Sequence, residues 1–147
     1  MHTKVFIDAN VIIDLFEKSR PFHNHSVFAI KELLSNENIE LFISTDMVSN
    51  IFYILKNRYK YGFENTLEVI EKISQIFSLH SVDKNDINLS IDVCKKHIFK
   101  DYEDALQFIC ALSNECTLII TNNPKDFKNS SIDIKTTKEL CDLWKLT

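Results

Sequence analysis

Short runs of uninterrupted apolar residues constrain the fold of this chain more than any other feature of its sequence. The clearest are Val5–Ile7, Leu41–Ile43 and the segment 117–120, and weaker strand-like segments follow at residues 79–82 and 132–134. A short apolar run without polar alternation is typical of a strand that is buried on both faces, as in a parallel sheet covered by helices. The sequence therefore predicts a short central parallel sheet.

Between these runs, apolar residues recur with the 3.6-residue spacing of amphipathic helices. The spacing predicts helices over residues 11–16, 25–34, 45–59, 64–77, 86–94, 101–112 and 137–144. Strands that alternate with helices predict an α/β fold, here a three-layer α/β/α sandwich. Because no linker, repeat or low-complexity tract interrupts the pattern, we expect a single domain over residues 1–147.

Composition excludes several classes of function. Gly62 is the only glycine in 147 residues, so the glycine-rich loops that bind dinucleotides or nucleotide phosphates are absent. A net charge of −4 argues against a protein that coats nucleic acid nonspecifically, although a local basic rim is compatible with it. No segment approaches the roughly 18 apolar residues of a membrane span, so we expect a soluble, cytoplasmic protein without a membrane partner.

The cysteines and histidines show none of the short spacings that are typical of zinc sites. All four cysteines stand in apolar patterns, and we expect reduced thiols that pack as small hydrophobic groups: Cys94, Cys110, Cys116 and Cys141. A G-x-S-x-G motif is also absent, so covalent hydrolysis has little support.

Polar residues gather where the predicted strands end. Asp8 follows the first strand, Asn123 comes shortly after the strand at 117–120, and Asp104 lies in the first turn of the helix before that strand. Because the carboxyl ends of parallel strands meet at one edge of a sheet, we expect these side chains to converge if the two strands are neighbours. Clustered carboxylates favour a bound cation, and Mg²⁺ or Mn²⁺ suits oxygen ligands. The pattern predicts metal-dependent hydrolysis of a phosphodiester bond.

Three segments carry a family resemblance that spans nearly the whole chain. They are VFIDANVIID from residue 5, DYEDALQ from residue 101 and ITNNPKDF from residue 120. The first resembles the opening of a PIN domain, the nuclease fold of VapC-type toxins. The other two resemble the third-acid helix and the T-x-N-x-x-D-F segment of one prokaryotic branch of that family. The resemblance implies a Mg²⁺- or Mn²⁺-dependent endoribonuclease with an RNA substrate, an inhibiting antitoxin partner and a homodimeric state.

The resemblance also implies roles for individual residues. It makes Asp8, Asp104 and Asn123 catalytic, and it makes Asp8, Asp104 and Asp126 the residues that hold the metal. Asn123 and Asp126 have a simpler interpretation as well, because Asn and Asp commonly build turns by bonding to their own backbone. Two further acids of the first helix are expected to be solvated surface residues: Asp14 and Glu17.

One position departs from the pattern of the family. Asn50 stands where many relatives carry a glutamate, and an amide offers a carbonyl oxygen but no charge. Asp101 and Glu103 are candidates to supply the missing charge. If the departure abolishes catalysis, the chain is instead a PIN-like RNA- or protein-binding module. A metal-dependent phosphatase is a third interpretation, but the first strand does not end in the D-x-D motif of that chemistry.

Two basic groups are candidates for RNA contact. Lys56 and Arg58 alternate with tyrosines, an arrangement that suits phosphate contact and base stacking but also an ordinary exposed helix end. Lys100 belongs to a second basic group directly before the acidic helix, where it could steer RNA towards a metal or simply be solvated.

Overall fold

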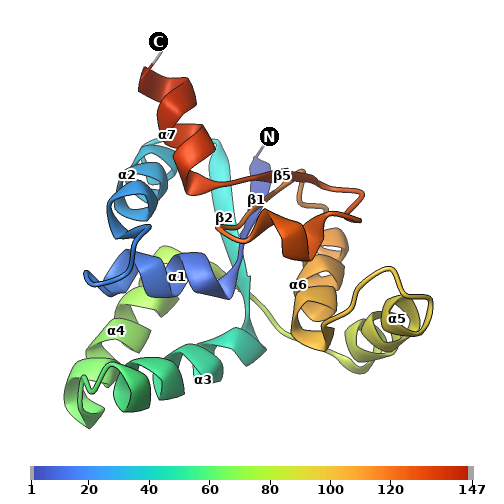
Figure 1. The fold of residues 1–147 in the computed structure, drawn as a ribbon, viewed down its shortest axis with the longest axis horizontal. Helices are drawn as coiled ribbons and strands as arrows, with labels where there is room; N and C mark the ends of the chain where they lie inside the picture. The colour runs from blue at the N-terminus through green and yellow to red at the C-terminus, as the bar shows by residue number, and fades with distance from the viewer. Residues whose placement is uncertain (1, 146–147) are drawn as a thin grey trace.

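A five-stranded parallel sheet forms the centre of the computed structural model, which describes residues 2–145 (Figure 1). Its strands lie in the order β3-β2-β1-β4-β5, and every neighbouring pair is parallel. Their bounds are β1 (Thr3–Ile7), β2 (Ile39–Ser44), β3 (Ser78–His80), β4 (Leu118–Ile120) and β5 (Asp133–Lys135). The predicted short parallel sheet is confirmed.

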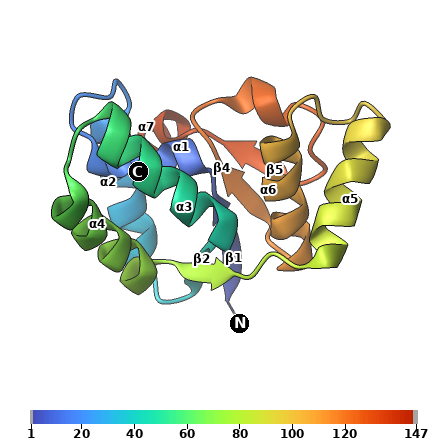
Figure 2. The same cartoon turned by 90° about the horizontal axis from the view of Figure 1, so that it is seen from below.

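Seven α-helices of the described residues flank the sheet. They are α1 (Ala9–Phe16), α2 (His23–Leu34), α3 (Thr45–Tyr53), α4 (Phe63–Ile76), α5 (Lys84–Lys95), α6 (Tyr102–Ser113) and α7 (Thr137–Lys145). α1, α2, α4 and α7 gather on one side, whereas α5 and α6 lie together on the other (Figures 1 and 2). This arrangement confirms the predicted α/β/α sandwich. That residues 1–147 form one domain stays a prediction, and residues 1, 146 and 147 lie outside the described part of the chain.

The central strands are buried because their apolar residues face helices on both sides. Phe6, Ile7, Ile43, Ile119 and Ile120 are all fully buried or nearly so. Burying a side chain of this size stabilises the fold by roughly 1.5–3 kcal/mol. In the parallel register Ile7 pairs with Ile120, so the residues that follow them emerge at the same edge of the sheet.

The predicted helix over residues 45–59 is wrong in its last third. α3 ends at Tyr53, and a π-helical turn, η1 (Ile54–Arg58), replaces the α-helix. The Tyr59 N–H donates to the Ile54 carbonyl at 3.3 Å, five residues back, while Leu55 stays buried in the core. A π-helical turn holds one residue more than an α-helical turn, and here it leaves Leu55 in the core. The chain then changes direction at Gly62, whose φ of 79° suits glycine.

Other predictions concern the thiols and the membrane. All four cysteines are free; Cys110, Cys116 and Cys141 are buried, while Cys94 is half-buried. Along residues 2–145, no helix is both long and apolar enough to cross a membrane.

Candidate active site

Asp8 lies at the C-terminal end of β1, where the strand passes into α1. Its carboxylate is buried, with the residue only 2% exposed, and its Oδ2 accepts a hydrogen bond from the Thr121 hydroxyl at 2.7 Å. The Gln107 side chain also hydrogen-bonds to it, and Gln107 Oε1 accepts the Ala9 N–H at 3.2 Å. Burial raises the pKa of Asp8, although these bonds act in the opposite direction. Asp8 is therefore a carboxyl group held in place in a site where its pKa lies above the ordinary value.

Asp104 lies in the first turn of α6 and faces the same site. Asp101 caps this helix, since its Oδ1 accepts the Asp104 N–H at 3.0 Å. Burial, followed by the charges of Asp101, Asp126, Asp8 and Glu103, raises the pKa of Asp104 to about 7. Four acids thus concentrate negative charge around one carboxylate. An all-oxygen donor set with this much negative charge fits a hard divalent cation such as Mg²⁺ or Mn²⁺.

The segment after β4 brings Asp126 to these acids. Asn123 precedes a short 3₁₀ turn, η2 (Pro124–Phe127), and its carbonyl accepts the Asp126 N–H at 3.0 Å. The Asn123 N–H donates to the Thr121 hydroxyl at 3.0 Å, and that hydroxyl in turn donates to Asp8. Asn123 thus starts the turn through its backbone atoms, while its exposed side chain makes no capping hydrogen bond there, and a catalytic role for that side chain stays a prediction.

Asn50 reaches the site through Glu103. Its Nδ2 donates to Glu103 Oε1 at 3.1 Å, which joins α3 to the first turn of α6. Glu103 also contributes to the raised pKa of Asp104, so its charge lies near the other acids. The Asn50 amide therefore holds the Glu103 carboxylate at the site, and its place at the position of a family glutamate stays a prediction.

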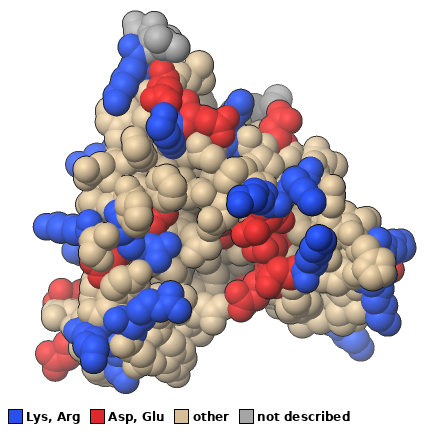
Figure 3. All heavy atoms as spheres, viewed as in Figure 1, with Lys and Arg blue, Asp and Glu red and all other residues tan. Residues whose placement is uncertain are grey.

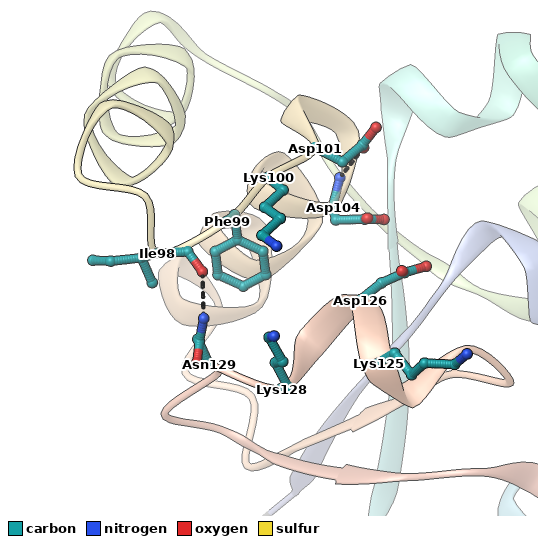
Figure 4. Close-up of a pocket in the computed structure, with 9 residues that line it drawn as sticks. All are labelled: Ile98, Phe99, Lys100, Asp101, Asp104, Lys125, Asp126, Lys128 and Asn129. Atoms are coloured by element: carbon teal, nitrogen blue, oxygen red, sulfur yellow. Dashed lines mark hydrogen bonds between the residues drawn. The ribbon is translucent and has the colours of Figure 1, made fainter.

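A groove of about 190 Å³ opens beside Asp104 and Asp126 (Figure 4). Lys100 and Lys128 point their ammonium groups into it, and Lys125 lies on the same turn as Asp126. Within residues 2–145, no ion pair joins any of these three lysines to a carboxylate. Acidic and basic side chains also adjoin at this hollow in the space-filling view (Figure 3).

The structure separates the two predicted basic groups. Lys100 lines the groove beside Asp104. Arg58 lines a different, shallower hollow together with Asn50 and Tyr53, on η1 and the end of α3. Lys56 is half-buried on η1.

Sequence reasoning assigned no role to Thr121 or Gln107, although both touch Asp8. One signal for Gln107 was available, because it follows Asp104 by three residues and a helix brings such positions onto one face. For Thr121 the signal is its position: it is a polar residue directly after β4, as Asp8 is directly after β1.

The prediction that Asp14 is solvated is wrong. It is 1% exposed, and it forms an ion pair with Arg20 and accepts a hydrogen bond from Asn122 Nδ2 at 2.7 Å. Asn122 also donates to Ser26 at 3.2 Å, and its Oδ1 accepts from the Thr137 hydroxyl at 2.7 Å. Because Arg20 and Asn122 each satisfy one oxygen of this carboxylate, its burial costs less than that of an isolated charge. Glu17, predicted to be solvated, is half-buried.

The fold and its acidic edge define the class of this protein. The family model described as a PIN domain matches residues 4–125, and the chain belongs to the PIN domain family. The curated protein Ribonuclease VapC1 from Aquifex aeolicus (strain VF5) is 34% identical over 142 residues, which cover 96% of this chain and 95% of that protein. The family resemblance is confirmed; the motifs of its particular branch stay a prediction.

Solved structures share the fold. VapBC2 from Rickettsia felis, bound to a DNA fragment from its promoter, matches with a TM-score of 0.69 at 15% identity, over 91% of this chain and 98% of that chain. VapBC-1 from nontypeable Haemophilus influenzae gives a TM-score of 0.68 at 20% identity, over 92% and 99%. VapC20 from Mycobacterium tuberculosis, a sarcin–ricin loop cleaving toxin, gives 0.63 at 14% identity, over 78% and 86%.

Proposed function

We propose that this protein is a metal-dependent endoribonuclease and the toxin of a toxin–antitoxin pair. The observation that carries the proposal is the convergence of Asp8, Asp104 and Asp126 at one edge of the sheet, where burial and mutual repulsion raise the pKa values of Asp8 and Asp104. The similarity to Ribonuclease VapC1 over nearly the whole chain supports the same activity.

The three carboxylates are the proposed ligands of a Mg²⁺ or Mn²⁺ ion. A divalent ion at such a site supplies a more acidic bound water and neutralises charge that develops on a phosphate. Thr121 and Gln107 orient the Asp8 carboxylate, and Asp101 and Glu103 add negative charge beside Asp104. The Asn123 side chain, at the entrance of η2, is proposed to contribute its amide oxygen.

The lysines of the groove are the proposed contacts for RNA phosphates. Lys100, Lys125 and Lys128 line it together with Asp104 and Asp126, so a phosphate held there lies next to the acids. Arg58 extends the basic surface on the other side of Asn50, and Lys56 adds to it from η1. A bound strand would then cross the acidic edge between two positively charged regions, which steers the substrate by electrostatic attraction.

The test is single-turnover cleavage of structured and unstructured RNAs with Mg²⁺, Mn²⁺ or a chelator. We expect the wild-type protein to cleave only with a metal ion, and Asp8→Asn and Asp104→Asn each to cleave at least ~1,000-fold more slowly, equivalent to about 4 kcal/mol of transition-state stabilisation. Asp133→Asn, an exposed acid on β5, is the matched control and should cleave normally. Equal cleavage by wild type and both site variants would overturn the assignment.

A binding module remains the second candidate because Asn50 carries no charge where relatives carry a glutamate. Its hydrogen bond to Glu103 supports the nuclease, because it holds a charged carboxylate near the other acids. If the wild type binds RNA but never cuts it, and Mn²⁺ binding does not depend on Asp8, the binding module is correct. If Asn50→Ala lowers cleavage while Asp8 still binds Mn²⁺, Glu103 acts as the substitute acid.

The proposed partners are an antitoxin and a second copy of the chain. Exposed aromatic side chains on α3 and α4, Tyr53 and Phe63, pack edge-on against Phe52 with ring centroids 5.4 and 6.0 Å away. Such exposed apolar surface is typical of a contact site. Analytical ultracentrifugation should give the mass of a dimer, and the product of an adjoining small open reading frame should inhibit cleavage.

A further inference from the structure

A second group of metal-ligating side chains lies apart from the catalytic carboxylates. His80 ends β3, Asp86 lies in the first turn of α5, and Cys110 lies on α6. One ligand atom from each residue falls within 4.8 Å of the other two. Cys110 follows Asp104 by six residues on the same helix, so the two positions are about 9 Å apart along its axis.

The fold holds these three residues on rigid elements. α5 lies alongside α6 in both ribbon views (Figures 1 and 2). Asp86 closes a capping box with Asp83 at the start of α5, and its Oδ1 accepts a hydrogen bond from Ser113 at 2.9 Å. Its Oδ2 lies 2.8 Å from His80 Nε2. The carboxylate and the imidazole are therefore positioned before any ligand arrives.

Ser44 supplies an independent observation. It pairs with His80 in the register of β2 and β3, it is 0% exposed, and its hydroxyl has no hydrogen-bond partner that meets ordinary geometry. The hydroxyl lies close enough to the Cys110 thiol to lower the pKa of that thiol against the stronger effect of burial. A buried hydroxyl without a partner is rare in native proteins and indicates a ligand at that position.

A purely structural role explains only part of this group. The capping box and the His80–Asp86 contact account for Asp86 and His80. They do not account for a fully buried thiol beside an unsatisfied hydroxyl. A metal ion would bind the three donor atoms and leave a thiolate beside the Ser44 hydroxyl.

We propose that His80 Nε2, Asp86 Oδ2 and Cys110 Sγ, with the Ser44 hydroxyl beside them, form a zinc site that fastens β3 to α5 and α6. Sulfur and imidazole donors favour Zn²⁺, whereas Mg²⁺ prefers oxygen alone. Zn²⁺ binds such donors at about 2.0–2.3 Å, so tetrahedral ligand atoms lie roughly 3.3–3.7 Å apart. The His80–Asp86 contact has to widen by roughly 0.5–1 Å. As the zinc–sulfur bond forms, the Cys110 proton leaves to solvent, and His80 binds as the neutral imidazole.

The sequence did not reveal this site because its donors come from three separate elements. Zinc motifs are recognised by short spacings, whereas residues 80, 86 and 110 match none of them. Only the packing of α5 on α6 and the parallel register at the edge of the sheet bring the donors together.

The test uses Co²⁺ as a spectroscopic substitute for Zn²⁺ on the metal-free full-length protein. We expect one equivalent to give a sulfur-to-cobalt charge-transfer band in the wild type, and Zn²⁺ to displace it. Cys110→Ser should lose the band, and Cys116→Ser, which removes a different buried thiol, should keep it. Asp8→Asn should also keep the band, which separates this site from the nuclease site.

His80→Gln is a second variant in case Cys110→Ser does not fold. The His80 ring is partly exposed, so we expect its replacement to disturb the core less. We expect this variant to bind Zn²⁺ at least ~100-fold more weakly in a competition with a chromophoric chelator. Zn²⁺ should raise the melting temperature of the wild type and of Asp8→Asn, but not of His80→Gln. No band in the wild type, or a band that persists in Cys110→Ser, would overturn the proposal whatever the outcome of the cleavage assay.

Discussion

At Asp8, burial and hydrogen bonding act on one carboxylate in opposite directions. Burial raises its pKa, whereas the bonds from Thr121 and Gln107 stabilise the ionised form. A sequence pattern identified Asp8, because an acid after a buried strand is a local feature. It assigned no role to Thr121 or Gln107, because their contacts to Asp8 depend on how β4 and α6 pack against β1.

Thr121→Val removes a donor to Asp8 while it keeps the shape of the side chain. We expect the pKa of Asp8 to rise further and Mn²⁺ affinity to fall about tenfold, since the carboxylate loses a hydrogen bond worth about 1.4 kcal/mol. Isothermal titration calorimetry measures the affinity. Thr117→Val, at an exposed position before β4, is the control, and an equal loss in both variants would contradict the role of Thr121.

Asp104 makes the stability of the metal-free protein depend on pH. Its pKa of about 7 in the folded state lies above the ordinary value of 3.8, so the folded state binds the proton more tightly than the unfolded state. The stability from this proton is fully present below pH 3.8 and is lost as the pH rises through about 7.

We expect the metal-free wild type to lose about 1–2 kcal/mol of unfolding free energy between pH 5 and pH 7.5, a value reduced from the full shift because solvent screens the half-exposed group. Denaturant unfolding at several pH values measures it. The loss should be smaller in Asp104→Asn, and Mn²⁺ should offset it in the wild type. The same slope in both proteins would assign the effect to other groups.

At the scale of elements, a buried polar network joins segments that are far apart in the sequence. Asn122, after β4, contacts Asp14 on α1, Ser26 on α2 and Thr137 at the start of α7. This network holds the segment that carries Thr121 and leads into η2. Amphipathic spacing predicted the helices themselves, but Asp14 looked solvated because the partners that make its burial tolerable lie in other elements.

Asn122→Ala should destabilise the protein by about 2–4 kcal/mol, since it leaves Asp14 and Thr137 with unsatisfied buried groups. Urea unfolding measures the change. Asn123→Ala, at the exposed neighbouring position, should change stability by less than about 0.5 kcal/mol. A similar cost at both positions would show that the loop, rather than the network, determines the effect.

Helix ends were harder to predict than helices. The apolar positions of residues 45–59 keep the spacing of an α-helix to the end of the segment. No local sequence feature therefore indicates the π-helical turn η1, in which Leu55 is buried in the core. The acidic first turn of α6, by contrast, has both a capping residue and the acids that favour a helix N-terminus, and its start was predicted within a residue.

At the scale of the whole molecule, the net charge is −4, but the charged side chains are distributed unevenly over the surface. Acidic side chains and lysines adjoin at the hollow in Figure 3, and three lysines line the groove beside the acids. The net charge argued against a protein that coats nucleic acid nonspecifically. It could not indicate this groove, because the residues of the groove come from two segments, one before α6 and one after β4.

RNA binding should therefore depend on salt through a small number of contacts. For cleavage-inactive Asp8→Asn, we expect log K for single-stranded RNA to fall with log salt at a slope of about −3.5, as contacts from the five proposed basic side chains predict. Replacing Lys100, Lys125 and Lys128 by Gln should bring the slope to about −1.4, the part that Lys56 and Arg58 supply. Fluorescence anisotropy measures it, with Lys31, Lys72 and Lys84 replaced as the control set; an unchanged slope in the groove variant would place RNA elsewhere.

The position of β1 in the sheet also governs when the site can exist during synthesis. β1 is the first strand made, yet it lies between β2 and β4, and Asp8 meets Thr121 only after 113 further residues have been added. At about 5–20 residues per second, that interval lasts roughly 6–23 s. A growing chain, or one cut short before β4, therefore carries Asp8 without the neighbours that complete its site. On the ribosome, the nascent chain therefore passes through an interval in which the acidic edge of the sheet is not yet assembled.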